Sequence, residues 1–131
     1  MIAPQLAGNL LGCETSDFIL AEWSDAGGPP GPPRWIAPLY IHHDDDEAWY
    51  VLEGSLCVRL GDEEVTANAG SGVLVPRGVE HTYWNPGPGP VRYLLCMTPN
   101  IYRLIQSIHA LNERCPAIMA ELFERHRSTL L

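Results

Sequence analysis

The sequence contains no lysine, and this absence removes a whole class of covalent chemistry. A lysine Schiff base, including the usual attachment of pyridoxal phosphate, needs a lysine amine. Basic residues are scarce in general, because eight arginines stand against sixteen acidic residues and give a formal net charge of −8. An acidic chain repels a phosphate backbone, so we expect no nucleic-acid partner.

Long apolar runs and cysteine pairs are missing as well. No apolar run approaches the ~18 residues of a membrane span, and the N-terminus lacks the basic start and apolar stretch of a signal peptide. We therefore expect a cytoplasmic protein with no membrane partner. The cysteines show no C-x-x-C spacing, which argues against a zinc knuckle, and a chain with 46% hydrophobic residues can bury a core without disulfides. We expect free thiols at Cys13, Cys57, Cys96 and Cys115.

What the sequence does contain is a series of short runs rich in Val, Ile, Leu, Tyr and Trp, separated by Gly, Pro, Asp and Asn. Regularly spaced short strands with such turn signals are typical of an all-β sandwich or barrel. Gly61 and Asp62 predict a tight hairpin turn, and the proline-rich segments 27–33 and 86–90 predict loops. We expect strands at 18–23, 35–42, 48–52, 56–60, 64–67, 72–75, 81–84 and 91–97.

The pattern becomes helical after Pro99. Apolar residues then recur at helical spacing, Asn100 is a candidate N-cap, and Pro116 fits the first turn of a second helix. We therefore divide the chain into a barrel over residues 1–98 and a helical extension over residues 99–131, within one structural domain. The extension is expected to pack on the barrel or on a second subunit, and a homodimer is the expected assembly.

Two imidazoles and one carboxylate fall where neighbouring strands bring side chains together. Tyr40 and His42 lie two residues apart on an expected strand and share one face, whereas His43 faces the other side. Glu47 follows across an acidic turn, and His81 begins a later strand. If both segments lie on one sheet face, His42, Glu47 and His81 converge inside the barrel. Such a set is typical of a facial site for one divalent iron, manganese, nickel or zinc ion.

These residues belong to two motifs whose order and spacing resemble those of the cupin family. The first cupin motif, G-(x)5-H-x-H-(x)3–4-E-(x)6-G, is matched in its later part by His42, Glu47 and Gly54. The second motif, G-(x)5-P-x-G-(x)2-H-(x)3-N, is matched in full by Gly70, Pro76, Gly78, His81 and Asn85. The chain thus resembles a small single-domain cupin of the cupin-2 type, and its segment 38–54 resembles quercetinase-like proteins. The resemblance implies an all-β jelly-roll barrel, also called a double-stranded β-helix, with a short helical tail.

The resemblance also implies a metal site with one substituted ligand. Cupins typically hold one divalent metal ion with three histidines and one glutamate, and by position His42, Glu47 and His81 correspond to three of these. Tyr40 occupies the place of the remaining histidine, and Arg34 that of the first motif's leading glycine. A phenol has an unperturbed pKa near ~10, so Tyr40 either ligates after a metal lowers that pKa or hydrogen-bonds to a bound water.

Three functions stay open at this point. The first is a metal-dependent dioxygenase or related oxidoreductase acting on a small aromatic or diketone-like molecule, with Glu47 as a ligand that also takes a proton. The second is a metal-free isomerase or epimerase that uses His42 or His81 as base and Tyr40 as acid. The third is a non-catalytic protein that binds a small ligand, in which the same residues form a hydrogen-bonded polar cluster without a metal.

For the other polar and aromatic residues near the motifs, we first expect structural or surface roles. Trp49 and Tyr83 fit either the barrel core or the wall of a substrate pocket, and they are the candidate pocket-lining residues. The acidic turn at 44–46 is expected to be solvated. Asn85 is expected to cap a turn, and His109 is expected to face solvent from the first helix.

Overall fold

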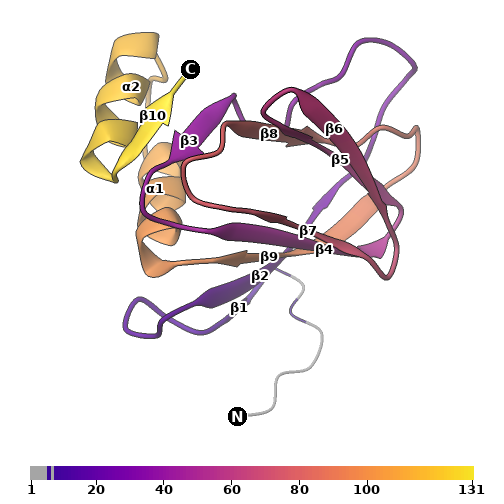
Figure 1. Ribbon diagram of the computed structural model, residues 1–131, viewed down its shortest axis with the longest axis horizontal. Coiled ribbons are helices and arrows are strands. Elements are labelled where there is room, and N and C mark those ends of the chain that lie inside the picture. The colour runs from indigo at the N-terminus through magenta and orange to yellow at the C-terminus, as the bar shows by residue number, and fades with distance from the viewer. Residues whose placement is uncertain (1–5, 7) are drawn as a thin grey trace.

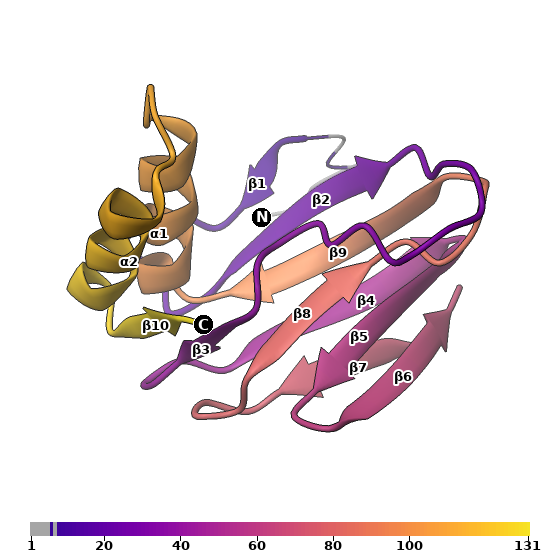
Figure 2. The same cartoon turned by 90° about the horizontal axis from the view of Figure 1, so that it is seen from above.

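The protein consists of two facing antiparallel sheets with two helices at one end (Figures 1 and 2). The computed structural model describes residue 6 and residues 8–131, and these residues form ten strands. The first sheet runs in the spatial order β1 (Leu10–Leu11), β2 (Ile19–Asp25), β9 (Val91–Met97), β4 (Glu47–Glu53), β7 (Gly72–Val75). The second runs β10 (Ser128–Leu130), β3 (Tyr40–His42), β8 (His81–Trp84), β5 (Ser55–Leu60), β6 (Glu63–Asn68). The predicted all-β barrel with a helical C-terminal tail is confirmed.

The core lies between the two sheets and follows from the alternation of side chains along each strand. Every second residue of β9, from Val91 to Met97, is buried. On the neighbouring β4, Trp49 and Val51 point into the same space and are 1% and 0% exposed. Each large apolar side chain removed from water in this way contributes roughly 1.5–3 kcal/mol. Glu47 begins β4 with the same parity as Trp49, so the fold carries its carboxylate to the inside as well.

Tight turns hold the strands in register. The two residues between Leu60 and Glu63 join β5 to β6, and Gly61 adopts a φ of 57°, so the predicted hairpin turn is confirmed. Gly54 separates β4 from β5 with a φ of 78°, and a Cβ at this position would meet the carbonyl oxygen of Pro90. Only glycine combines that backbone conformation with so close an approach.

The first helix, α1 (Pro99–His109), begins two residues earlier than an N-cap at Asn100 implied. Thr98 is the N-cap, and its hydroxyl accepts a hydrogen bond of 3.2 Å from the backbone N–H of Ile101. The prediction that Asn100 caps this helix is therefore wrong. Asn100 lies inside the first turn, and its side chain reaches instead to the loop and tail around β3, where it donates two hydrogen bonds.

The second helix, α2 (Pro116–Arg125), has proline in its first turn, as predicted. It packs against α1 and covers one end of the barrel, where Leu104, Leu122 and Phe123 form a small core with Tyr40 of β3. The two helices therefore close the barrel over the strand that carries Tyr40 and His42 (Figure 1). Within the described residues, neither helix has the length and apolar character needed to cross a membrane.

The strand expected at residues 35–42 is present only in its last part, Tyr40–His42. Pro38 has no N–H to donate to a ladder, and upstream of it the chain forms a single isolated bridge between Trp35 and Trp84. The residues before β3 therefore run alongside β8 as an irregular segment.

The last strand, β10, was not expected from the sequence. Arg127 adopts a left-handed φ of 54° directly after α2 and turns the chain back toward the barrel. The last residues then add to the edge of the second sheet, with Ser128 opposite His42 and Leu130 opposite Tyr40. The C-terminal extension is thus helical only in part, and its final strand lies beside the residues of the candidate site.

Candidate metal centre

The predicted site residues come together from both sheets. Tyr40 and His42 project from β3 and His81 from the start of β8, and Tyr40 is the direct neighbour of His81 in the second sheet. Glu47, in contrast, starts β4 of the first sheet and does not pair with β3. The expectation that all three ligand candidates share one sheet face is therefore wrong, because the carboxylate crosses the barrel interior to meet the imidazoles.

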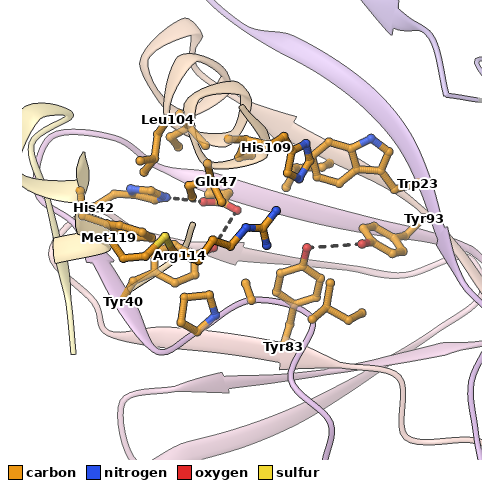
Figure 3. A pocket seen from close by; sticks show the side chains of 18 of the residues that line it. Trp23, Tyr40, His42, Glu47, Tyr83, Tyr93, Leu104, His109, Arg114 and Met119 are labelled. Atoms are coloured by element: carbon orange, nitrogen blue, oxygen red, sulfur yellow. Dashed lines mark hydrogen bonds and ion pairs between the residues drawn. The ribbon is translucent and has the colours of Figure 1, made fainter. Parts of the chain in front are cut away.

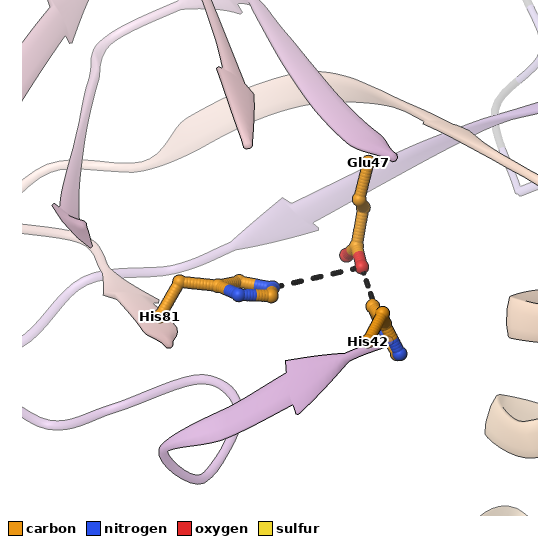
Figure 4. Close-up of side chains that lie close together, drawn as sticks. All are labelled: His42, Glu47 and His81. Carbon is orange, nitrogen blue, oxygen red and sulfur yellow. Dashed lines mark ion pairs between the residues drawn. The ribbon is translucent and has the colours of Figure 1, made fainter. Parts of the chain in front are cut away.

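The two imidazoles and the carboxylate lie close together in the barrel interior (Figure 4). The Nε2 atom of His42 is 2.7 Å from Oε2 of Glu47, and the Nε2 atom of His81 is 3.8 Å from the same oxygen. One ligand atom from each residue lies within 4.8 Å of the others. All three side chains are at most 3% exposed, so water does not screen these charges.

The contact of His81 Nδ1, the ring nitrogen that points away from Glu47, determines which of the two ring nitrogens carries a hydrogen. Nδ1 lies 2.9 Å from the carbonyl oxygen of Val79. A carbonyl oxygen only accepts, so Nδ1 must donate. In the neutral imidazole, Nε2 then presents a lone pair toward Glu47, which is the tautomer that a metal ligand needs.

His42 is held in the same way by the C-terminal strand. Its Nδ1 atom lies 2.7 Å from the hydroxyl oxygen of Ser128, and that hydroxyl donates its own hydrogen to the carbonyl oxygen of His126 at 3.2 Å. The oxygen is therefore left to accept from Nδ1. Nε2 of neutral His42 presents a lone pair inward, as that of His81 does.

The inward atoms lack hydrogen bonds. Among the described residues, Nε2 of His42, Nε2 of His81 and Oε2 of Glu47 are buried without a hydrogen-bond partner. The 2.7 Å approach of His42 to Glu47 has the distance of an ion pair but not the direction of a hydrogen bond. Buried polar atoms of this kind need compensation. Two imidazole nitrogens and one carboxylate oxygen are suitable donors for a divalent transition metal, so the residues present fit such an ion.

Glu47 is ionised in this setting. Burial alone would raise the pKa of its carboxyl group, but in the metal-free protein the close approach of His42 and His81, when these imidazoles carry a proton on Nε2, outweighs burial and lowers the pKa to about 2. The site therefore presents a carboxylate to a cation at neutral pH.

Tyr40, the residue in place of a third histidine, forms a hydrogen bond to the carboxylate, and its ring packs against the neighbouring imidazoles. Its hydroxyl donates a hydrogen bond of 3.2 Å to Oε1 of Glu47, the oxygen that does not face His42. Its ring lies 4.2 Å from the ring of His81, measured between centroids. Burial, and next the negative charge of Glu47, raise the pKa of Tyr40 well above its ordinary value. The hydroxyl is thus protonated at neutral pH and orients the carboxylate.

His43 and the acidic turn lie outside this cluster. His43 is exposed on the opposite face of β3, and its Nε2 lies 2.7 Å from the hydroxyl of Thr129. The turn after it is more than solvated surface, because its three aspartates contact the protein. Asp44 pairs with Arg127, Asp45 accepts from Asn100, and Asp46 pairs with Arg77. Exposed ion pairs add little stability singly, but together these contacts connect the segment between His42 and Glu47 to the C-terminal tail and to the loop before β8.

A cavity of about 370 Å³ leads to the cluster from the helical end of the barrel (Figure 3). Its walls are mainly apolar and aromatic, and Tyr83 contributes to them, with its hydroxyl 3.3 Å from that of Tyr93. Trp49 does not line this cavity. It is 1% exposed and packs edge-on against His81 at 5.8 Å between ring centroids, so it supports the imidazole from the core.

Three residues had not been assigned to the site from the sequence. Ser128 anchors His42, and His109 and Arg114 line the cavity from α1 and from the loop between the helices. His109 is exposed, as expected, yet it borders the cavity. Asn85, outside the site, accepts from the N–H of Gly87 and so caps its turn, as predicted.

Two curated relatives match about half of this chain. A tetracenomycin polyketide synthase protein, TcmJ, of Streptomyces glaucescens is 35% identical over 60 residues, which cover 46% of this chain and 40% of that protein. A mannose-1-phosphate guanylyltransferase of Escherichia coli is 34% identical over 56 residues, which cover 43% of this chain and 12% of that protein. The chain therefore spans less than half the length of either relative.

The fold has counterparts among solved structures. A protein with a double-stranded β-helix domain from Klebsiella pneumoniae aligns with a TM-score of 0.55 at 22% identity, covering 75% of this chain and 83% of that one. The Cupin_2 family model, described as a cupin domain, matches residues 32–97, which include both motifs and all three ligand candidates. This match covers half of the chain, and the protein therefore belongs to the cupin family.

Proposed function

We propose that this protein is a metal-dependent cupin enzyme, with one divalent transition metal ion held by His42, Glu47 and His81. The observation that carries the proposal is the orientation of both imidazoles. Each donates through Nδ1 to a fixed acceptor, and each presents Nε2 to the ionised Glu47 without a hydrogen bond. Without a cation, these buried atoms are compensated only if a proton sits on the imidazole nitrogens that face Glu47.

The chain's own residues divide the work around such an ion. When bound, iron, manganese, nickel or zinc supplies Lewis acidity, and a redox-active ion also supplies oxygen activation. Val79 and Ser128 keep the imidazoles in the ligating tautomer. Tyr40 holds one oxygen of Glu47 by a hydrogen bond and leaves the other free for a cation. The apolar cavity excludes bulk water from the reacting groups.

The cavity supports a small aromatic or otherwise apolar substrate. Its walls combine aromatic residues with aliphatic residues of both helices, and its volume lies at the small end of the usual range for ligand sites. The Streptomyces relative is named as a tetracenomycin polyketide synthase protein, which is compatible with a small organic substrate. We therefore propose an oxidoreductase of the dioxygenase type. Such a reaction places both atoms of O₂ in the product and needs no further reductant.

A metal-free isomerase is the second candidate, because Tyr40 lines the cavity and its ring lies beside that of His81. The hydroxyl of Tyr40, however, is already donated to Glu47. If the substrate of this isomerase were a sugar nucleotide, its binding would also require many hydrogen-bonding groups. Most residues that line this cavity are instead apolar or aromatic. A non-catalytic ligand-binding protein is the third candidate, and it differs from the first in lacking both the metal ion and turnover.

Metal content separates these candidates. The protein is produced without a chelating tag, and its metal is measured by elemental analysis beside His42→Ala and His43→Ala variants. The two histidines are adjacent, but His43 is exposed and outside the cluster, which makes it a matched control. We expect about one ion per chain in wild type and in His43→Ala, and a large loss in His42→Ala. A wild type that takes up no iron, manganese, nickel or zinc would contradict the proposal.

Turnover is then tested on the metal-loaded protein. Oxygen uptake in the presence of a panel of small hydroxylated aromatic and diketone compounds is expected for at least one redox-active ion. Deuterium incorporation from solvent without oxygen uptake would favour the isomerase instead. Ligand binding without either signal would favour the non-catalytic alternative.

A further inference from the structure

We propose that Arg114 makes the cavity selective for carboxylic acids, so that the substrate is a small aromatic acid. This inference rests on the proposed function, because it names the substrate class of the same site. It starts from the composition of the cavity wall, in which Arg114 is the single arginine and lysine is absent from the whole chain. A positive side chain beside a largely apolar space favours a ligand that combines an apolar body with a negative charge.

Arg114 has no carboxylate partner of its own. Five of the eight arginines pair with an acidic side chain, namely Arg59, Arg77, Arg92, Arg125 and Arg127. Within the described residues, Arg34, Arg103 and Arg114 have no such ion pair, and of these three only Arg114 lines the cavity. The protein is strongly acidic, so an unpaired arginine at this position is not a consequence of scarce carboxylates.

The position of Arg114 is set by the fold. It lies in the short connection between α1 and α2, the two helices that close the end of the barrel. Figure 3 shows its side chain extended toward the cavity, in front of Tyr83 and Glu47. The guanidinium is exposed enough to stay solvated without a ligand. It therefore does not need a buried partner, and a ligand anion can replace its water.

The rest of the cavity complements the remainder of such a ligand. Trp23, Leu95, Ile105, Ile108 and Phe123 contribute aromatic and aliphatic surface for a ring. His109, at the end of α1, offers another ring nitrogen at the same cavity. A guanidinium binds a carboxylate through two parallel N–H donors, which fixes the orientation of the ligand as well as its charge. The acid would thus enter with its ring in the cavity and its carboxylate at Arg114.

The test compares acids with their uncharged amides. The probes are 4-hydroxybenzoate, 4-hydroxyphenylacetate and 4-hydroxycinnamate, each beside its amide, with inorganic phosphate as a separate anion. Binding to the metal-loaded protein is measured by calorimetry for wild type, Arg114→Gln and Arg103→Gln. Arg103 is also exposed and without an ion pair, but it lies outside the cavity and so serves as the control.

We expect at least one acid to bind wild type about tenfold more tightly than its amide, as one charge-assisted pair implies. The preference should disappear in Arg114→Gln and persist in Arg103→Gln. Equal binding of acids and amides to wild type, no binding of any acid, or an equal loss in Arg103→Gln would overturn the inference. Tighter binding of phosphate than of every carboxylate would also overturn it.

Metal content of the same samples separates this inference from the proposed function. A protein that holds its metal but does not prefer acids contradicts the role of Arg114 and leaves the metal centre intact. A protein that prefers acids through Arg114 but takes up no metal supports the role of Arg114 and contradicts the proposed metal centre. Arg114→Gln is expected to retain the full metal content, because Arg114 belongs to none of the three ligand residues.

Discussion

Removing the hydroxyl of Ser128 tests how the fold prepares His42 for a metal. Ser128 is 2% exposed, and its oxygen lies between Nδ1 of His42 and the carbonyl oxygen of His126. That carbonyl also accepts from Asn100, so it keeps a partner in Ser128→Ala. The Nδ1–H group of His42 loses the acceptor that Ser128 supplies, and a buried donor without a partner costs about 1–3 kcal/mol. Loss of the outer partner of a ligating histidine typically weakens metal binding by about 10–100-fold.

The assay has two parts. Metal affinity is measured by competition with a chromophoric chelator, and the free energy of unfolding of the metal-free protein is measured in urea. The control is Thr129→Val on the same strand, because the Thr129 hydroxyl contacts the exposed His43 on the other face. We expect Thr129→Val to leave metal affinity unchanged and to alter stability by only about 0.5 kcal/mol. Unchanged metal affinity in Ser128→Ala, or an equal loss in Thr129→Val, would show that Ser128 does not prepare His42 for a metal.

Three further predictions concern the groups around the cluster. Tyr40→Phe should retain the metal with less than about tenfold loss in affinity, because the phenol orients Glu47 through one hydrogen bond; a chelator competition that shows no binding would make the phenol a ligand. The pKa of Glu47 is lowered from 4.5 to about 2, so its ionisation stabilises the fold above pH 4.5 and this contribution is lost as the pH falls toward 2. Urea unfolding of the metal-free protein should lose up to about 3 kcal/mol in this window, and an equally steep loss in Glu47→Gln would contradict the assignment. Phe123→Ala should cost about 3–5 kcal/mol, because the ring is 2% exposed and packs against Tyr40, whereas Ile118→Ala on the exposed side of α2 should cost far less in the same unfolding experiment.

The ligand residues could be predicted because they depend on short spacings. Tyr40 and His42 share a face by strand parity, and the motif spacings predicted that Glu47 and His81 lie near them. Which sheet carries each residue could not be predicted, since pairing of β4 with β7 and β9 depends on contacts far along the chain. This is why Glu47 was expected on the same sheet as the histidines.

The residues that surround the ligands were harder to foresee. Ser128 contacts a residue 86 positions away, from a three-residue strand too short to show an alternating pattern. Arg114 reaches the cavity only because two helices fold over the end of the barrel, and a lone arginine in a loop has no sequence signature. The cap of α1 was misassigned because Thr98 and Asn100 are both good capping residues, and the choice between them is decided by where the helix begins.

X-ray absorption on the metal-loaded protein identifies the ligands of the ion. With zinc bound, we expect scattering from two imidazole rings with Zn–N distances of about 2.0–2.1 Å and from at least one oxygen ligand. The imidazole contribution should fall to one ring in His81→Ala and stay at two in His43→Ala, because only His81 belongs to the buried cluster. A spectrum without imidazole scattering, or one dominated by sulfur, would contradict a metal centre built from His42, Glu47 and His81.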